Sequence, residues 1–118
     1  MKESPVFTKM YDLLLWLFPH TAKFPKTLRH TLTNRIENTA LESYRKLVGA
    51  AMGDKVSQEI FLQEADIELQ ILKMLVRISC DMKLMSKSTY GHFCSLAEEV
   101  GRLIGGWRNS LKRGKVES

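Results

Sequence analysis

Residues that interrupt helices are scarce in this 118-residue sequence, and they are confined to a few places. All three prolines (Pro5, Pro19 and Pro25) lie in the first 25 residues, and no Asn-Gly or Asp-Gly pair occurs to form a tight β-hairpin. The remaining 93 residues have no proline and few β-branched clusters, which is typical of long helices. The longest apolar run, residues 13–18, is far shorter than the ~20 residues that a membrane span needs.

Patterns that carry catalysis or bind metals are also missing. The three histidines stand apart from one another, and Cys80 and Cys94 do not form a Cys-x-x-Cys pair. No glycine-rich phosphate loop follows a strand-like segment. We therefore expect no metal, no cofactor and no enzymatic activity. The two thiols are expected to be buried and unbridged, and the N-terminus lacks the features of a signal peptide, which favours a cytoplasmic protein with no membrane association.

Hydrophobic periodicity divides the chain into four amphipathic segments. The expected helices run over about residues 5–22, 26–53, 55–84 and 86–112, with a kink at Pro19 in the first and a frayed tail at 114–118. Ser57 is the expected cap of the third helix, and Ser86 or Ser88 that of the fourth. Because the connections are short, we expect one all-α domain over residues 1–118, an up-down-up-down four-helix bundle.

The third segment carries more apolar residues than one buried face needs. On the first segment, the apolar positions of the expected helix include Phe7, Met10, Tyr11, Leu14, Leu15 and Phe18. On the third, polar residues form a single stripe, and apolar residues fill most of the remaining circumference. A helix on the outside of a bundle usually needs an apolar arc of little more than ~100°, so the third helix has roughly twice that.

Basic residues exceed acidic residues by five, and the sequence assigns this excess to the second and fourth segments. Residues 1–25, 26–53, 54–85 and 86–118 carry net charges of +1, +3, −2 and +3. The candidate basic residues on the third and fourth helices are Lys73, Arg77, Arg102, Arg108, Lys112 and Arg113. Clustered Lys and Arg favour an anionic partner such as nucleic acid. The alternative is a solvated face with intrahelical pairs such as Glu98 with Arg102.

Glycines inside the fourth segment are a second signal, because each one costs roughly 1 kcal/mol in a helix relative to alanine. Ala97, Gly101 and Gly105 recur every four residues, and Trp107 follows them. This spacing predicts a smooth groove that a helix can approach closely. The approaching helix belongs either to the same chain or to another subunit.

Three groups of residues resemble the accessory variability determinant proteins of diversity-generating retroelements. Residues 97–107 (AEEVGRLIGGW) resemble the final-helix motif of that family. Residues 17–19 (LFP) with 24–26 (FPK) resemble its first helix and exit, and residues 65–66, 72–73 and 76–77 its third helix. The resemblance spans about residues 10–113. It is shared with four-helix-bundle proteins encoded in intervening sequences of bacterial large-subunit ribosomal RNA genes.

The resemblance implies a non-catalytic bundle that assembles into a homopentamer with a basic surface. Members of the retroelement branch associate with a reverse transcriptase, bind nucleic acid, and are needed for the mutagenic copying of a template RNA into cDNA. By position, the residues implicated in polymerase contact correspond to Lys73, Arg77 and Arg102 with its basic neighbours. A family arginine is Lys73 here, which keeps the charge and loses the bidentate fork.

The leading hypothesis is therefore an oligomeric accessory protein of a diversity-generating retroelement, with a reverse transcriptase and weakly sequence-specific RNA or DNA as partners. Two alternatives stay open. One is a protein of the ribosomal intervening-sequence type with an RNA-related role. The other is a structural adaptor between proteins, in which the basic charge only aids solubility.

Overall fold

The computed structural model describes residues 5–117, and these residues form helices without any strand. The four long helices are α1 (Pro5–Thr21), α2 (Asn34–Met52), α3 (Lys55–Asp81) and α4 (Lys87–Glu117). Two short helical turns, η1 (Lys26–Leu28) and η2 (Arg29–Thr33), precede α2. The expected all-α four-helix architecture is confirmed. Residues 1–4 and 118 lie outside the described residues. The expectation of no signal peptide and that of a frayed tail depend partly on these residues.

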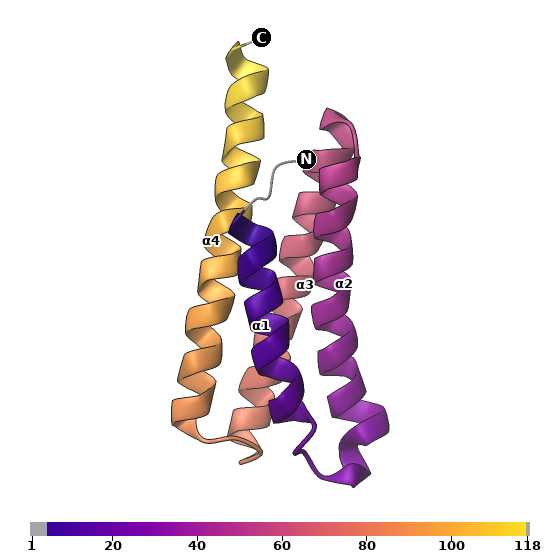
Figure 1. Cartoon of the computed structure of the whole chain (residues 1–118), viewed down its shortest axis with the longest axis vertical. Helices are drawn as coiled ribbons and strands as arrows, with labels where there is room; N and C mark the ends of the chain where they lie inside the picture. The colour runs from indigo at the N-terminus through magenta and orange to yellow at the C-terminus, as the bar shows by residue number, and fades with distance from the viewer. Residues whose placement is uncertain (1–4, 118) are drawn as a thin grey trace.

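The four helices alternate in direction, as Figure 1 shows. α1 packs mainly against α2 and α4, and α3 packs against the same two helices, so α1 and α3 lie on a diagonal of the bundle. The molecule is elongated, with extents of 52 × 25 × 21 Å, and the end of α4 projects beyond the α2–α3 turn (Figure 1). The α1–α2 and α3–α4 connections, residues 22–33 and 82–86, lie together at the other end, which we call the lower end (Figure 1).

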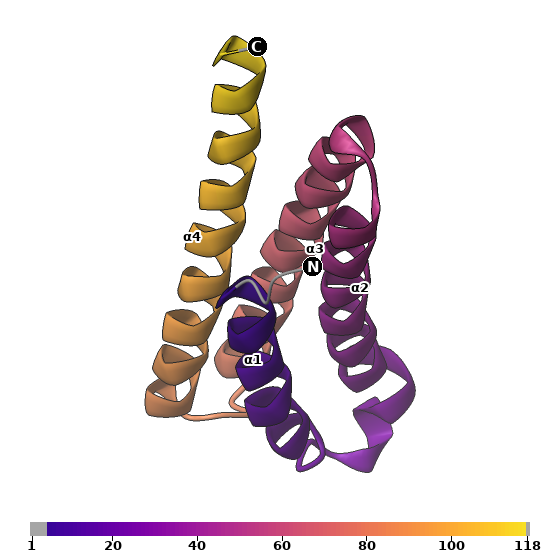
Figure 2. The same cartoon turned by 45° about the horizontal axis from the view of Figure 1, so that its top comes forward.

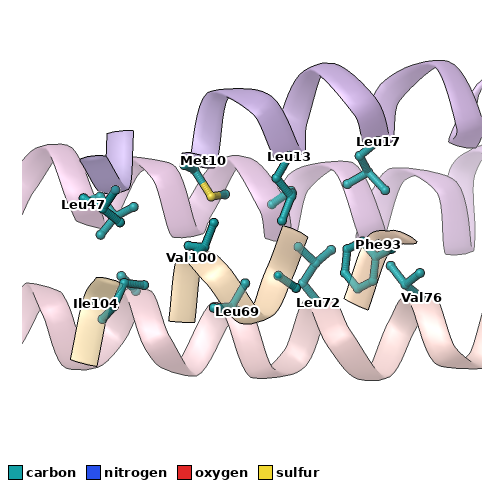
Figure 3. Packing of buried hydrophobic residues seen from close by; sticks show 14 of the residues in the cluster. Met10, Leu13, Leu17, Leu47, Leu69, Leu72, Val76, Phe93, Val100 and Ile104 are labelled. Carbon is teal, nitrogen blue, oxygen red and sulfur yellow. The ribbon is translucent and has the colours of Figure 1, made fainter. Parts of the chain in front are cut away.

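The core draws fully buried apolar side chains from all four helices (Figure 3). In that view the side chains of α1 point toward those of α3 and α4, and the labelled residues include Leu13, Leu47, Leu72 and Phe93. Burial of each such side chain contributes roughly 1.5–3 kcal/mol of hydrophobic stabilisation. These contacts fix the directions in which the remaining faces of the helices point.

The buried face of α1 differs from the one that the sequence predicts. The face toward the core consists of Val6, Met10, Leu13 and Leu17, whereas Tyr11 and Leu15 are about 61% and 62% exposed. Residues 13–18 are apolar at every position, so periodicity alone does not identify the buried side of this helix. Pro19 lies two residues before the end of α1, where its missing N–H affects only the last turn, and the kink expected there stays a prediction.

The start of the second helix also differs from the expectation. A helix was predicted from residue 26, but η1 is a 3₁₀ turn, η2 is a π turn, and regular α-helix begins only at Asn34. Leu28 and Leu32 are nevertheless half-buried, and Ile36 is fully buried. The four-residue spacing therefore predicted which side chains face inward, but not the hydrogen-bonding pattern of the backbone.

The cap of α3 is Asp54 and not Ser57, which corrects the sequence-based assignment. The Ser57 N–H donates to Asp54 Oδ1 at 2.9 Å, and this bond lowers the pKa of the Asp54 carboxyl below its ordinary value. On α4, Ser86 caps the helix as expected, since its Oγ accepts from the Thr89 N–H at 3.0 Å.

Two helix ends were also misplaced. α3 ends at Asp81 instead of Leu84, because Lys83 adopts a left-handed φ of 67° and its N–H turns back to the Cys80 carbonyl. α4 continues to Glu117, past the expected end near Lys112. Cys80 and Cys94 are unbridged, as expected, but they are half-buried and not fully buried.

Candidate nucleic-acid interface

The six candidate basic residues lie on α3 and α4, which pack against each other and run antiparallel (Figure 1), and we call this pair of helices the seam. Two of the six are placed at the contact between the helices, since Arg108 pairs with Asp66 and Arg77 lies close to Tyr90. α3 supplies Lys73, which is half-buried, and Arg77, which is exposed. α4 supplies the other four, Arg102, Arg108, Lys112 and Arg113. From residue 102 to 113, α4 rises about 16 Å at ~1.5 Å per residue, so the six charges form a line and not a compact cluster.

Two of the four α4 candidates are held by carboxylates of the same chain. Arg102 binds Glu99 with two guanidinium nitrogens, one of them Nε at 3.3 Å from Oε1. The expected partner was Glu98, which is one position away from the carboxylate that is used. Arg108 Nη1 lies 3.6 Å from Asp66 Oδ2 and so joins α4 to α3.

The Arg102 pair leaves the arginine available to a partner. The two side chains are 68% and 35% exposed, and exposed ion pairs contribute only about 0–1 kcal/mol. A phosphate or a carboxylate of another molecule therefore competes with Glu99 at little cost. The Arg108 pair is more enclosed and acts as a link between two helices.

The α3 end of the seam is the point where Arg77 faces Tyr90 of α4. Burial raises the pKa of the Tyr90 phenol above its ordinary value, and the neighbouring Cys94 raises it further, while the positive charge of Arg77 lowers it. Tyr90 is therefore neutral at physiological pH and supplies a hydroxyl, not a charge, beside Arg77. The seam is positive at this point.

The glycine groove of α4 is partly used inside the chain. A Cβ at Gly101 would lie 3.5 Å from Leu69 Cδ2, so this glycine faces α3. A Cβ at Gly105 would meet nothing within 4 Å. Trp107 is half-buried, and its ring lies 6.3 Å from that of Phe7 on α1. Of the two alternatives for this groove, packing within the monomer accounts for Gly101 and Trp107.

A larger exposed apolar surface lies on α3. Six large apolar residues of this helix and Met82, which directly follows it, are exposed. They recur at intervals of three, four or seven residues, so they form one stripe on the side away from the core. This α3 stripe consists of Val56, Ile60, Ile67, Ile71, Met74, Ile78 and Met82. Its signal in the sequence was the over-wide apolar arc of the third segment.

A second apolar surface lies between α1 and α2. It is a groove of about 500 Å³, lined by Phe7, Tyr11, Leu14, Leu41 and Tyr44 among others. Leu15 of α1 is also exposed. This surface was not predicted, because Tyr11 and Leu15 were placed in the same apolar set as the residues that face the core. Exposed apolar surfaces of this kind mark interaction sites.

The family model described as bAvd-like matches residues 6–111 of the chain. The chain belongs to the bAvd-like family. The match begins in α1 and ends in α4, so it includes both connections at the lower end, both apolar surfaces and the candidate basic residues up to Arg108. Membership makes this chain an accessory protein of the Avd type. None of the curated proteins matches it.

Two findings complete the description of this bAvd-like chain. Among the described side chains, those of residues 5–114, no three His, Cys, Asp or Glu come together in a group that fits a metal ion. Over the same residues, no helix combines the length and the apolar character that crossing a membrane requires.

Proposed function

We propose that this chain is a non-enzymatic, nucleic-acid-binding accessory subunit of the reverse transcriptase of a diversity-generating retroelement. The observation that carries the proposal is the bAvd-like match over residues 6–111. It favours the retroelement branch over the ribosomal intervening-sequence type. The exposed basic residues along the seam supply a charge suited to phosphates or to an acidic polymerase surface.

The chemistry of this role is binding and positioning. Lys and Arg neutralise phosphates and release counterions, which gives affinity with little sequence preference and a steep dependence on salt. Arg77 and Arg102 are exposed on adjacent helices, and Arg102 exchanges its weak pair with Glu99 for a partner. Association with the polymerase would then hold template RNA close to the enzyme that copies it, in a cytoplasmic setting.

Self-association is part of the same proposal. The α3 stripe and the α1–α2 groove lie on different sides of the bundle, because α1 and α3 are diagonal. When the stripe of one copy seats in the groove of the next, the contact is heterologous, and such contacts close into rings. A ring of five subunits is what the family resemblance implies, and it would repeat the basic surface around one axis.

The experiment that tests the polymerase role is co-purification with the reverse transcriptase of the same element. Charge reversal at the seam (Lys73→Glu, Arg77→Glu, Arg102→Glu) is expected to reduce the retained polymerase at least tenfold, since like charges then face each other. The matched control is the triple reversal Lys9→Glu, Arg45→Glu and Lys55→Glu, which changes the net charge by the same amount at positions away from these three. Full retention of polymerase by the seam variant would instead support the structural adaptor.

Nucleic-acid binding is measured separately on the wild-type chain. Fluorescence anisotropy with single-stranded RNA over a salt series should give log K falling linearly with log salt, by about 0.7 for each phosphate neutralised. An absence of binding at low salt would remove nucleic acid from the proposed function. Co-purification with the polymerase would still stand in that case.

A further inference from the structure

The lower end of the bundle gathers charge that the sequence distributes over different helices. Residues 20–37 end α1, form η1 and η2 and begin α2, while residues 77–92 end α3 and begin α4 (Figure 1). Figure 2, turned by 45°, keeps the two connections at the same end. The two connections border one groove, which is lined by His30 and Arg35 from one side and by Met82 from the other.

Charge at this end is mostly positive. Residues 20–37 contain four basic residues, Lys23, Lys26, Arg29 and Arg35, and one acidic residue, Glu37, which accepts a hydrogen bond from Thr21 at 2.6 Å. Residues 77–92 add Arg77, Lys83 and Lys87 and contain one acidic residue, Asp81. Seven basic residues against two acidic residues give +5, which equals the net charge of the whole chain, so the rest of the sequence is neutral.

These seven cations are free to meet a ligand. All seven side chains are exposed, and no ion pair in residues 5–117 involves any of them. By contrast, Lys46, Arg102 and Arg108 elsewhere on the bundle are paired with Glu64, Glu99 and Asp66. Unpaired like charges on one small end repel one another, so an anion that binds there relieves this repulsion.

The backbone at this end also has two unusual conformations, which are typical of functional sites. Lys83 holds a φ of 67°, a conformation that glycine adopts without strain and that lysine rarely adopts. η2 is a π turn, and single π turns are frequent at functional sites. The turn places His30 and Thr31 on the solvent side of the connection, where both are exposed.

A groove of about 720 Å³ opens beside the basic residues, between the start of α2 and the end of α3. Its lining includes His30, Asn34, Arg35, Asn38, Leu75 and Met82. Two amides provide donors and acceptors for a base edge, an imidazole provides a stacking surface, and the Leu and Met side chains provide an apolar floor. The volume lies in the range of small-molecule sites and accommodates a nucleobase with its sugar.

From these observations we infer that the lower end of the bundle is a binding site for single-stranded nucleic acid. The phosphates lie on the basic residues of both connections, and an unpaired base enters the groove between α2 and α3. This site is distinct from the α3–α4 seam except for Arg77, and the inference rests on the proposed function because it assigns the nucleic acid to a surface. An acidic protein segment would use the charges but not the groove, so the groove favours a nucleic acid.

The test compares two triple variants that lose the same charge. Lys23→Gln, Lys26→Gln and Arg29→Gln neutralise the α1–α2 connection, and the matched control is Lys9→Gln, Arg45→Gln and Lys55→Gln, which lie away from the lower end. The probe is a labelled RNA strand of about 20 nucleotides, longer than the ~4–16 that one typical single-strand site covers. The slope of log K against log salt should fall by about two for the lower-end variant and by less than about 0.5 for the control.

A second comparison tests the groove. An abasic strand of the same length and charge should bind the wild-type chain more weakly, and Asn34→Ala with Asn38→Ala should abolish that difference. Both asparagines are exposed, so these changes leave the fold intact. Equal binding of the abasic strand by the wild-type chain would overturn the assignment of the groove.

The remaining outcomes separate the inference from the proposed function. If the wild-type chain binds RNA and both triple variants have the same slope, the lower end is not the site, while the proposed function stands. If the lower-end variant keeps RNA binding but loses the polymerase, the occupant is an acidic protein surface and the inference is wrong. If the wild-type chain binds no RNA at low salt, the nucleic-acid part of the proposed function fails together with the inference.

Discussion

Glycines at single positions of α2 and α4 differ in what surrounds them. A Cβ at Gly49 would lie 2.8 Å from the Phe61 ring and within 3.0 Å of three of its atoms, whereas a Cβ at Gly106 would meet nothing within 4 Å. Phe61 is itself held between α2 and α3, with Lys46 Nζ 5.9 Å from its ring centre. Rotation of the Phe61 ring about its own axis does not remove the clash with the new methyl group, because three adjacent ring atoms (Cδ1, Cε1 and Cζ) face it.

We therefore predict opposite effects of the same substitution. Gly106→Ala should raise the free energy of unfolding by roughly 0.5–1 kcal/mol, the helix propensity difference. Gly49→Ala should lower it by roughly 1–3 kcal/mol, as overpacking does, despite the same gain in propensity. Urea denaturation followed by circular dichroism measures both values. Equal stabilisation by the two changes would mean that Phe61 moves freely.

At the scale of elements, α1 has one apolar face in the core and a second apolar face exposed to solvent. Leu13 is fully buried, and Leu15, two residues on, is 62% exposed. We predict that Leu13→Ala lowers the free energy of unfolding by about 2–5 kcal/mol, through lost burial and a cavity. Leu15→Ala should change it by less than about 0.5 kcal/mol at concentrations where the chain is monomeric. A loss of more than 1 kcal/mol at Leu15 would place this side chain in the core.

A comparison of the helices shows which structural features the sequence could predict and why it could not predict the others. Four helices and the inward faces of α2 and α4 followed from periodicity, because burial there repeats with the helical turn. On α3, periodicity left two apolar flanks, and only the structure shows which one is buried. The face of α1 did not follow, since six consecutive apolar residues contain no polar side to mark solvent. Periodicity did not predict the π turn at Arg29–Thr33 either. A change in backbone hydrogen bonding over one turn leaves the spacing of the inward side chains almost unchanged.

At the scale of the whole molecule, the distribution of charge depends on topology. Division of the sequence by helix gave basic second and fourth segments and an acidic third segment. The bundle regroups the same residues by end, because every connection joins two antiparallel helices at one end. Arg77 and Lys83 then join Lys23 and Lys26, although their own segment is acidic overall. The candidate residues of the seam were predicted from local patterns, whereas the charge of the lower end required the fold.

Assembly also belongs to this scale, and the α3 stripe makes it testable. Ile67 and Ile71 are 50% and 43% exposed at the middle of the stripe. We predict that Ile67→Glu with Ile71→Glu converts the oligomer to a monomer, because a carboxylate buried in an apolar contact without a partner costs several kcal/mol. The matched control is Asn109→Glu with Ser110→Glu, which adds the same charge to exposed polar positions of α4, away from the α3 stripe. Light scattering at micromolar concentration should show an oligomer for the wild-type chain and the control, and a monomer for the stripe variant. A monomeric wild-type chain would refute self-association. If the stripe variant remained an oligomer, the contact between subunits would lie on another face. The Gly105 side of α4 would then be substituted next, because a Cβ at Gly105 meets nothing within 4 Å in the chain.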